Sequence, residues 1–265
     1  MNNTTLLTIL ALVTLFGSPA LRAQSKTEPK TAAKAADKLP VLNLAQSPDV
    51  AAPRYRDGQP DEDFIRSHER YVAIAKSGGV DVLFLGDSIT ARWRSVGKEI
   101  WEKSFASYKA ANFGIPADRT QHVLWRITHG EFDGIQPKVV VLMIGTNNGP
   151  TASDDAASIA RGVTAIVKTI LAKSPSTKVL LLGIFPRGSK PVGTFGPLQG
   201  KLKEINAILA KLHDGMSVHY LDIGEQFLTS GVLKSEIMPD FLHLSKAGYQ
   251  IWADAITPKL AELMK

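Results

Sequence analysis

The sequence changes from strand-like to helix-like character within VLFLGDSITARW, residues 82–93. Four large apolar residues lead into Gly-Asp-Ser, and the chain beyond them has helical character. A buried strand that delivers a small polar residue to its carboxyl end, just before a helix begins, is how open α/β sheets present reactive groups to a crevice. This stretch predicts an α/β fold and makes Ser88 a candidate functional residue.

Four more apolar runs follow along the chain, and all five have the composition of buried strands. They are VDVLFLG (80–86), YKAANFG (108–114), PKVVVLMIG (137–145), TKVLLLGIF (177–185) and SVHYLDIG (217–224). Most of them lie about 30 to 40 residues apart with helical segments between them, which indicates right-handed βαβ crossovers. We expect a three-layer α/β/α sandwich with about five parallel strands, covered by helices on both faces.

The segments between and around these runs show the spacing of helices. We expect a first helix over DEDFIRSHERYVAIAKSG (61–78), one over 159–171 with Ser153 or Asp154 as its cap, and one over 198–212 that stops near Gly215. A last helix is expected after Ser245, and Pro258 should disturb it.

The N-terminal part of the chain differs from the rest. An apolar run of about a dozen residues, followed by small residues around Ala23, is typical of a signal peptide over 1–23, although MNNTT lacks the usual positive charge and a retained anchor is the alternative. Residues 24–60 read as a flexible basic linker and N-terminal arm. We therefore expect an exported protein, periplasmic or extracellular, with no stable membrane span after processing and one principal domain over 61–265.

Composition limits the function further. The 265 residues include no cysteine, so disulfides and thiolate metal sites are excluded. The net charge of +6 is scattered once the linker is set aside, which disfavours nucleic-acid binding. GDSIT is neither a Walker loop nor a Gly-x-Gly-x-x-Gly turn, so a nucleotide-binding domain is also disfavoured.

Polar residues of unusual type follow several of the predicted strands, where the loops of a parallel sheet meet at one edge. Ser88 can serve as a nucleophile if a base removes its proton, and His243 is a residue type that gains and loses protons near neutral pH. Asp240, three residues earlier, can reach the far ring nitrogen of His243 and fix its tautomer. The backbone N–H of Ser88, the backbone N–H of Gly114 and the side-chain amide of Asn147 are candidate oxyanion donors.

Several residues beside these loops are candidate substrate contacts. They are Asp87, Arg119 and Phe185, with Trp93, Trp125 and, in the Gly- and Pro-rich stretch after the fourth strand, Arg187 and Phe195. Helix packing or an ordinary surface connection is the alternative for the aromatic residues and for this stretch.

Each motif alone has a structural alternative. Gly-Asp-Ser is common in turns, and Asn147 could cap a helix or form a turn with Asn148 and Gly149. Asp240 could be an N-cap, although Ser245 suits that position better. The other five histidines lack a comparable carboxylate at a strand end and are expected to be structural or exposed. Because four of these loops are expected to meet at one edge of the sheet, a catalytic site is favoured over four independent structural explanations.

Four ordered blocks of the chain resemble those of the SGNH, or GDSL-type, serine hydrolases. The blocks are FLGDSIT (84–90), NFGIPADRTQHVLWRI (112–127), VVVLMIGTNN (139–148) and DFLHLSKAGY (240–249). The sequences of these blocks are similar to those of the catalytic subunits of intracellular platelet-activating factor acetylhydrolase and of related bacterial acetylesterases. The similarity extends over about residues 60 to 265.

The resemblance implies Ser88 as nucleophile, Asp240 and His243 as its Asp-x-x-His pair, and Gly114 and Asn147 as oxyanion donors. It also implies a flavodoxin-like strand order, no metal or organic cofactor, a short acyl group and possible homodimers. The expected activity is hydrolysis of short-chain acyl esters, plausibly acetyl esters of carbohydrates. The alternatives are a lipid-directed acetylhydrolase or lysophospholipase-like esterase, and a non-catalytic glycan-binding protein that keeps the fold.

Overall fold

A computed structural model of the chain describes residues 46–188 and 197–265. The predicted signal peptide, the linker as far as residue 45, and Phe195 lie outside the described residues. Five parallel strands form the central sheet: β3 (Val82–Gly86), β4 (Ala110–Gly114), β5 (Val139–Met143), β6 (Lys178–Leu182) and β7 (Val218–Leu221). Each lies within one of the five predicted apolar runs.

The strand order across the sheet is β4-β3-β5-β6-β7, which confirms the flavodoxin-like order. The order of the strands across the sheet reverses at β3, because β4 lies on one side of β3 and β5 lies on the other side. In doubly wound sheets the crevice at the carboxyl ends of such a strand pair is where ligands bind. Here that crevice receives the residues after Gly86 and after Met143.

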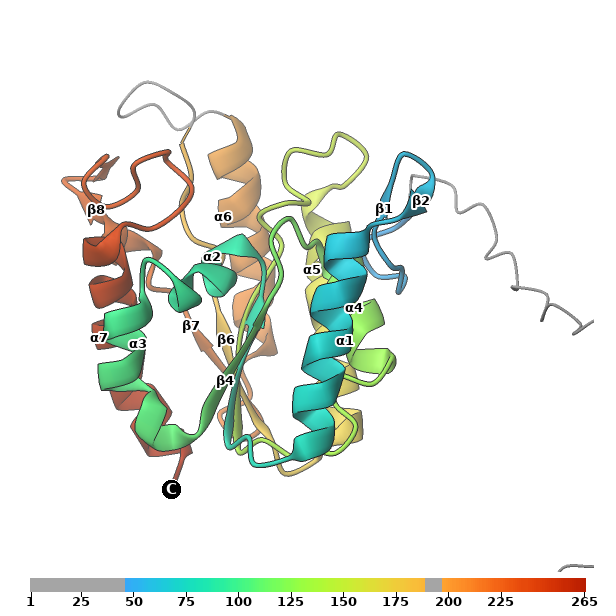
Figure 1. Ribbon diagram of the computed structural model, residues 1–265. Helices are drawn as coiled ribbons and strands as arrows, with labels where there is room; N and C mark the ends of the chain where they lie inside the picture. Colours follow the sequence, from blue (N-terminus) through green and yellow to red (C-terminus); the bar gives the residue numbers. More distant parts are fainter. Residues whose placement is uncertain (1–45, 189–196) are drawn as a thin grey trace, which may run out of the picture. The chain divides into compact units, whose positions relative to one another are not determined.

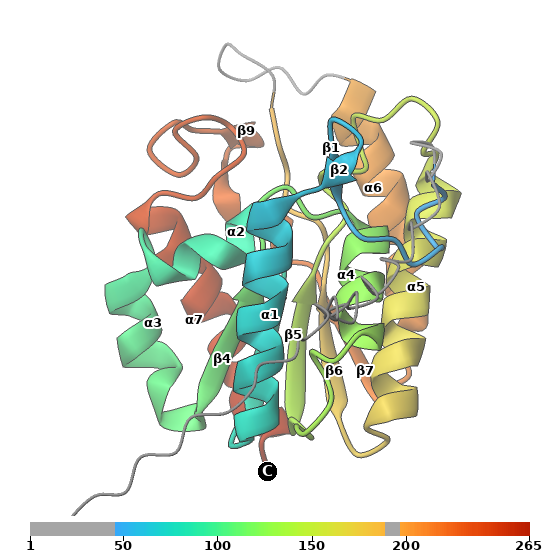
Figure 2. The ribbon, with the colours of Figure 1, turned by 45° about the vertical axis from the view of Figure 1, so that its right-hand side comes forward.

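Helices cover both faces of the sheet (Figure 1; Figure 2). On one face the buried side chains belong to α1 (Glu62–Ser77), α4 (Thr120–Thr128), α5 (Ala156–Lys173) and α6 (Pro197–Leu209). On the other face they belong to α2 (Ser88–Ala91), α3 (Lys98–Ser104) and α7 (Lys246–Leu263). Alternate residues of β3 and β5 contribute to the two cores, which confirms the three-layer sandwich. Short 3-10 segments complete the chain, at Arg92–Arg94, Ala106–Tyr108, Ala210–Leu212 and Gly224–Phe227.

Two helix ends differ from the sequence expectation. The N-cap of α5 is Asp155, whose side chain accepts the Ser158 N–H, and neither Ser153 nor Asp154 caps it. Asp154 is instead buried and accepts a hydrogen bond from Asn148. Helix α7 begins after the Ser245 cap as predicted, but it continues through Pro258. The helix has buried residues on both sides of the proline, and the stabilisation from their burial exceeds the cost of the hydrogen bond that the proline cannot make.

Residues 46–60, called the strap below, have a defined path against the domain. This part of the predicted flexible linker is therefore not a free tether. The strap binds α4 through Ala52 N–H to the Gln121 carbonyl, at 3.1 Å, and through the Thr120 hydroxyl to the Pro48 carbonyl, at 2.8 Å. It then forms a small hairpin of β1 (Tyr55–Arg56) and β2 (Gln59–Pro60), whose Asp-Gly turn has positive φ at both residues. A second small hairpin, β8 (Leu228–Thr229) with β9 (Val232–Leu233), precedes the last loop.

Among the described residues, none of the helices is both long enough and apolar enough to span a bilayer.

Candidate active site

Ser88 is the first residue of α2, a four-residue helix that lies across the ends of β3 and β4. Two glycines allow this close approach: a Cβ at Gly86 would lie 2.3 Å from Thr90 Oγ1, and one at Gly114 would lie 2.3 Å from the Ala91 nitrogen. The carbonyls of α2 have side-chain partners, because Asn112 donates to Thr90 O at 2.8 Å and Tyr249 donates to Ile89 O at 2.6 Å. Tertiary contacts therefore hold a helix too short to be stable alone.

The structure brings the three predicted catalytic residues together. Ser88 Oγ lies 2.9 Å from His243 Nε2, and His243 Nδ1 lies 2.6 Å from Asp240 Oδ2. Ser88 is half-buried, while the Asp240 side chain is 49% exposed and that of His243 is 17% exposed. A hydroxyl, an imidazole and a carboxylate in this order form a path along which a proton can leave the hydroxyl.

A tight turn sets the distance between Asp240 and His243. Asp240 Oδ1 accepts the backbone N–H groups of Leu242, at 3.1 Å, and of His243, at 2.6 Å. Between them Phe241 adopts a left-handed conformation, with φ of 59°, which is strained for an aromatic residue. Its carbonyl accepts the Gly188 N–H at 3.0 Å, which ties the turn to the residues after β6.

The carboxylate of Asp240 stays charged at neutral pH. Burial raises its pKa, but the hydrogen bonds from the His243 ring and from the two backbone N–H groups outweigh burial and lower the pKa to about 2. A charged carboxylate requires a proton on His243 Nδ1, which leaves Nε2 free to accept the proton of Ser88.

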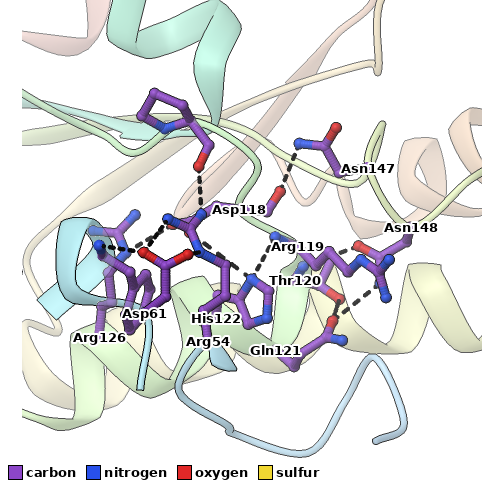
Figure 3. Close-up of polar contacts among 12 residues, drawn as sticks. Arg54, Asp61, Asp118, Arg119, Thr120, Gln121, His122, Arg126, Asn147 and Asn148 are labelled. Atoms are coloured by element: carbon purple, nitrogen blue, oxygen red, sulfur yellow. Dashed lines mark hydrogen bonds and ion pairs between the residues drawn. The ribbon is translucent and has the colours of Figure 1, made fainter. Parts of the chain in front are cut away.

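Asn147 follows β5 and lies beside the loop between β4 and α4 (Figure 3). Its Nδ2 donates to the carbonyl of Asp118 at 2.9 Å. It does not cap α5, but it does lie in a turn with Asn148 and Gly149, so the turn expected as its structural alternative is present together with the contact to Asp118. The neighbouring Asn148 has the structural role: it is fully buried, accepts the Thr120 N–H and donates to Gln121 and Asp154.

The structure gives Gly114 a different role from the one expected. Its N–H donates to Asn112 Oδ1 at 2.9 Å, so this group already has a partner within the chain. Its carbonyl accepts hydrogen bonds from Tyr71, at 2.8 Å, and from Arg94, at 3.0 Å. Gly114 is thus required for the packing of α2 against β4, and the expectation that it donates to an oxyanion is wrong in this geometry.

Two predicted substrate contacts are also wrong, because both side chains are buried. Asp87 has no exposed surface, and its Oδ1 accepts the Ile89 N–H at 2.9 Å as the N-cap of α2. Phe185 is 1% exposed and packs against Phe227 and Trp252. Trp93 is fully buried as well.

Arg119 stays a candidate contact, since it is half-buried where α4 begins. Trp125, also half-buried, stacks on His129 and packs against Phe64. The other histidines are not placed as bases for Ser88. His68 pairs with buried Glu131, and burial followed by nearby arginines lowers the pKa of His122 to about 3.

Sequence reasoning gave too little weight to Arg187. Its Nη1 donates to the Thr146 carbonyl at 3.0 Å, in the loop that carries Asn147, and its charge acts on both Asp87 and Asp240. Burial lowers the pKa of this arginine. The pattern Phe-Pro-Arg-Gly after a predicted strand is the signal that placed it near the site.

Asp87 makes the stability of the fold depend on pH. Burial raises its pKa from 3.8 to about 7, although the Ile89 N–H and Arg187 act in the opposite direction. Since the folded protein binds this proton more tightly than the unfolded chain, the free energy of unfolding should fall as pH rises from about 4 to about 7. The fall attributable to Asp87 is at most about 4 kcal/mol, from roughly 1.4 kcal/mol per pKa unit.

We expect Asp87→Asn to flatten this dependence, because an amide oxygen can still accept the Ile89 N–H but cannot ionise. Urea unfolding at pH 5 and pH 8 measures it. Asp155→Asn is the matched control: Asp155 also caps a helix but is exposed, and hydrogen bonds to Ser158 lower its pKa. Equal pH dependence in Asp87→Asn and the unmodified protein would contradict the assignment.

Comparison with known proteins identifies the group to which this site belongs. The family model described as GDSL-like lipase/acylhydrolase matches residues 84–251, from β3 to α7. The chain belongs to this family. Its members are carboxylic ester hydrolases, which fits the hydroxyl, imidazole and carboxylate brought together here.

The chain is similar to a curated relative and to two solved structures. Platelet-activating factor acetylhydrolase IB subunit alpha2 of Rattus norvegicus is 40% identical over 195 residues, which cover 73% of this chain and 81% of that protein. A GDSL-like lipase from Bacteroides thetaiotaomicron has the same fold, with a TM-score of 0.60 at 17% identity over 76% of this chain and 98% of its own. An acetylxylan esterase from Geobacillus stearothermophilus gives a TM-score of 0.54 at 16% identity over 70% and 94% of the two chains.

Proposed function

We propose that this GDSL-like hydrolase removes short acyl groups, acetyl above all, from ester substrates through an acyl-enzyme intermediate. The observation that carries the proposal is the hydrogen-bonded series Ser88 Oγ, His243 Nε2, His243 Nδ1 and Asp240 Oδ2, with distances of 2.9 and 2.6 Å. It supplies a nucleophile, a base and a group that orients the base.

The reaction has two balanced halves. In the first, His243 Nε2 takes the proton of Ser88 as Oγ bonds to the ester carbonyl carbon, and the imidazolium then gives that proton to the departing alcohol. In the second, His243 takes a proton from water, the resulting hydroxide adds to the acyl carbon, and Ser88 leaves with the proton. The charge of Asp240 stabilises the imidazolium in both halves.

Three N–H donors are proposed for the developing oxyanion. Ser88 supplies its backbone N–H at the start of α2, and Asn147 supplies the amide hydrogen that does not bind Asp118. The second backbone donor is assigned to Ala117 in place of Gly114. Among residues 46–188 and 197–265 the Ala117 N–H has no partner, and its φ of 65° is unusual for alanine, as expected where strain serves a site.

The acetyl group is proposed because relatives with very different alcohols share it. One is a platelet-activating factor acetylhydrolase subunit and the other an acetylxylan esterase. A carbohydrate hydroxyl is the favoured alcohol, because a predicted signal peptide would place the enzyme outside the cytoplasm, where acetylated polysaccharides occur. A lipid alcohol is the second candidate, supported by the 40% identity to the acetylhydrolase subunit.

Covalent labelling combined with a substrate panel tests this proposal. A fluorophosphonate probe should modify Ser88, identified by peptide mass spectrometry, and hydrolysis of p-nitrophenyl esters should be fastest for acetyl and fall with chain length. Acetylated xylo-oligosaccharides and an acetylated ether phospholipid distinguish the two alcohols. If the protein binds sugars but Ser88 is not labelled and no ester is hydrolysed, a non-catalytic glycan-binding protein is favoured and the proposal is refuted.

A further inference from the structure

We propose that Arg54, in the strap, is a positioning residue that keeps the Asn147 amide in its donating orientation. Arg54 acts through the β4–α4 loop, residues 115–118, as Figure 3 shows. This inference rests on the proposed function, in which Asn147 is an oxyanion donor. It gives a catalytic purpose to a segment that lies before the family-matched residues 84–251.

The orientation of the Asn147 amide depends on a single backbone carbonyl. Its Nδ2 donates to Asp118 O at 2.9 Å, and a carbonyl can only accept. The nitrogen side of the amide must therefore face the loop, which leaves its other hydrogen for an oxyanion. If the amide flipped, two oxygens would face each other and the donor would be lost. Displacement of the Asp118 carbonyl consequently displaces the donor.

Two arginines hold the loop that carries this carbonyl. Arg126 is fully buried; its Nε donates to Asp118 Oδ2 at 2.9 Å and its Nη2 donates to Phe113 O at 3.1 Å, at the end of β4. Arg54 reaches the middle of the loop, where its Nη1 donates to the Pro116 carbonyl and lies 3.6 Å from Asp118 Oδ1. Between Pro116 and Asp118 stands Ala117, with its left-handed backbone.

Arg54 is itself fixed from the side of α1. Its Nε lies 3.2 Å and its Nη2 lies 3.4 Å from the carboxylate of Asp61, which caps α1 by accepting the Phe64 N–H at 3.0 Å. The guanidinium also lies over the Phe64 ring, 5.2 Å from its centroid. The Arg54 side chain is only 13% exposed. A planar group with several fixed donors can transmit the position of α1 to the loop backbone.

The matched control is Arg56, two residues further along the strap. Its Nη2 lies 3.0 Å from the same Asp61 carboxylate, but its side chain is 68% exposed and, among the described residues, makes no hydrogen bond or ion pair with the β4–α4 loop. Arg54→Gln and Arg56→Gln therefore remove the same charge from the same carboxylate. Only the first removes a contact to the loop.

A double-mutant cycle between Arg54→Gln and Asn147→Ala tests the inference, with kcat and KM measured on p-nitrophenyl acetate. Asn147→Ala should lower kcat about 100- to 1,000-fold. Arg54→Gln should lower kcat about 10- to 100-fold, the cost of a misplaced donor, with KM changed less than about threefold. In the Asn147→Ala background the same substitution should cause a clearly smaller loss, at least about threefold smaller than in the unmodified enzyme, because the Asn147 donor is gone and only the Ala117 N–H in the same loop can still be displaced. Arg56→Gln should keep the kcat of the unmodified enzyme.

Equal losses from Arg54→Gln in both backgrounds would show a general structural role and overturn the inference, as would an unchanged kcat. If Arg54→Gln does not fold, Arg54→Lys replaces it in the same cycle under the same criteria, since lysine keeps the charge opposite Asp61 but not the forked donors. Labelling distinguishes failure of the proposed function from failure of this inference. If the unmodified enzyme neither hydrolyses esters nor is labelled at Ser88, the proposed function is refuted. If the enzyme is labelled and active but the effects of the two substitutions are additive, only the role of Arg54 is refuted.

Discussion

Ser88→Ala is expected to lower kcat for acetyl esters by at least about 10⁴-fold, with KM changed little. The substitution removes the hydroxyl that is proposed to form the acyl-enzyme, while the proposed oxyanion donors remain. The half-buried position of Ser88 tolerates a methyl group, so folding should be unaffected. Initial rates on p-nitrophenyl acetate and thermal unfolding of the same sample measure both expectations.

Ser95→Ala is the control for this substitution. Ser95 is an exposed serine soon after α2, and its hydroxyl donates to the Arg92 carbonyl at 3.3 Å. It should keep full activity and full labelling by the fluorophosphonate. A folded Ser88→Ala protein with more than about a tenth of the original kcat would refute the nucleophile assignment.

Asp240→Asn is expected to lower kcat by about 10⁴-fold without unfolding the protein. The amide oxygen can still accept the N–H groups of Leu242 and His243, so the turn keeps its shape. The amide nitrogen, a donor, would then face His243 Nδ1 and favour the tautomer with the proton on Nε2. That proton occupies the position that must accept the hydrogen of Ser88.

Asp214→Asn controls for the loss of a turn carboxylate. Asp214 Oδ1 accepts the N–H groups of Met216, Ser217 and Val218, where β7 begins and thus at the edge of the sheet opposite the site. We expect it to keep full kcat over pH 6 to 9. If Asp240→Asn keeps more than about a tenth of the original kcat, the orienting role assigned to Asp240 is wrong.

Strand order explains why the sequence predicted the meeting of distant residues. Each apolar run ends in a polar loop, and parallel strands bring all such loops to one edge, so Ser88 and His243 could be paired without coordinates. The Asp-x-x-His spacing was informative because a short turn between the two residues leaves few positions for the carboxylate other than beside the imidazole ring. These inferences depend on periodicity and spacing, which the sequence shows directly.

The wrong predictions concern residues whose orientation or hydrogen bonding depends on a neighbouring side chain. Gly114 could not be recognised as already bonded, because its partner, the Asn112 side chain, could equally have pointed elsewhere. Asp87 and Phe185 flank the reactive loops, but only packing shows that both side chains turn inward. The strap was taken as linker because it follows the lysine-rich segment 26–38, although Asp57-Gly58 is a strong hairpin signal that should have marked an ordered segment.

The hydrogen bond from Tyr249 to the Ile89 carbonyl has a consequence for the order in which the protein matures. Tyr249 and His243 both come from the last part of the chain, while the nucleophile is encoded in its first half. Until these last residues have been synthesised, the polypeptide carries the serine with neither its base nor the anchor of its short helix. The pair of Ser88 and His243 can therefore form only when the residues from Asp240 through α7 pack against α2.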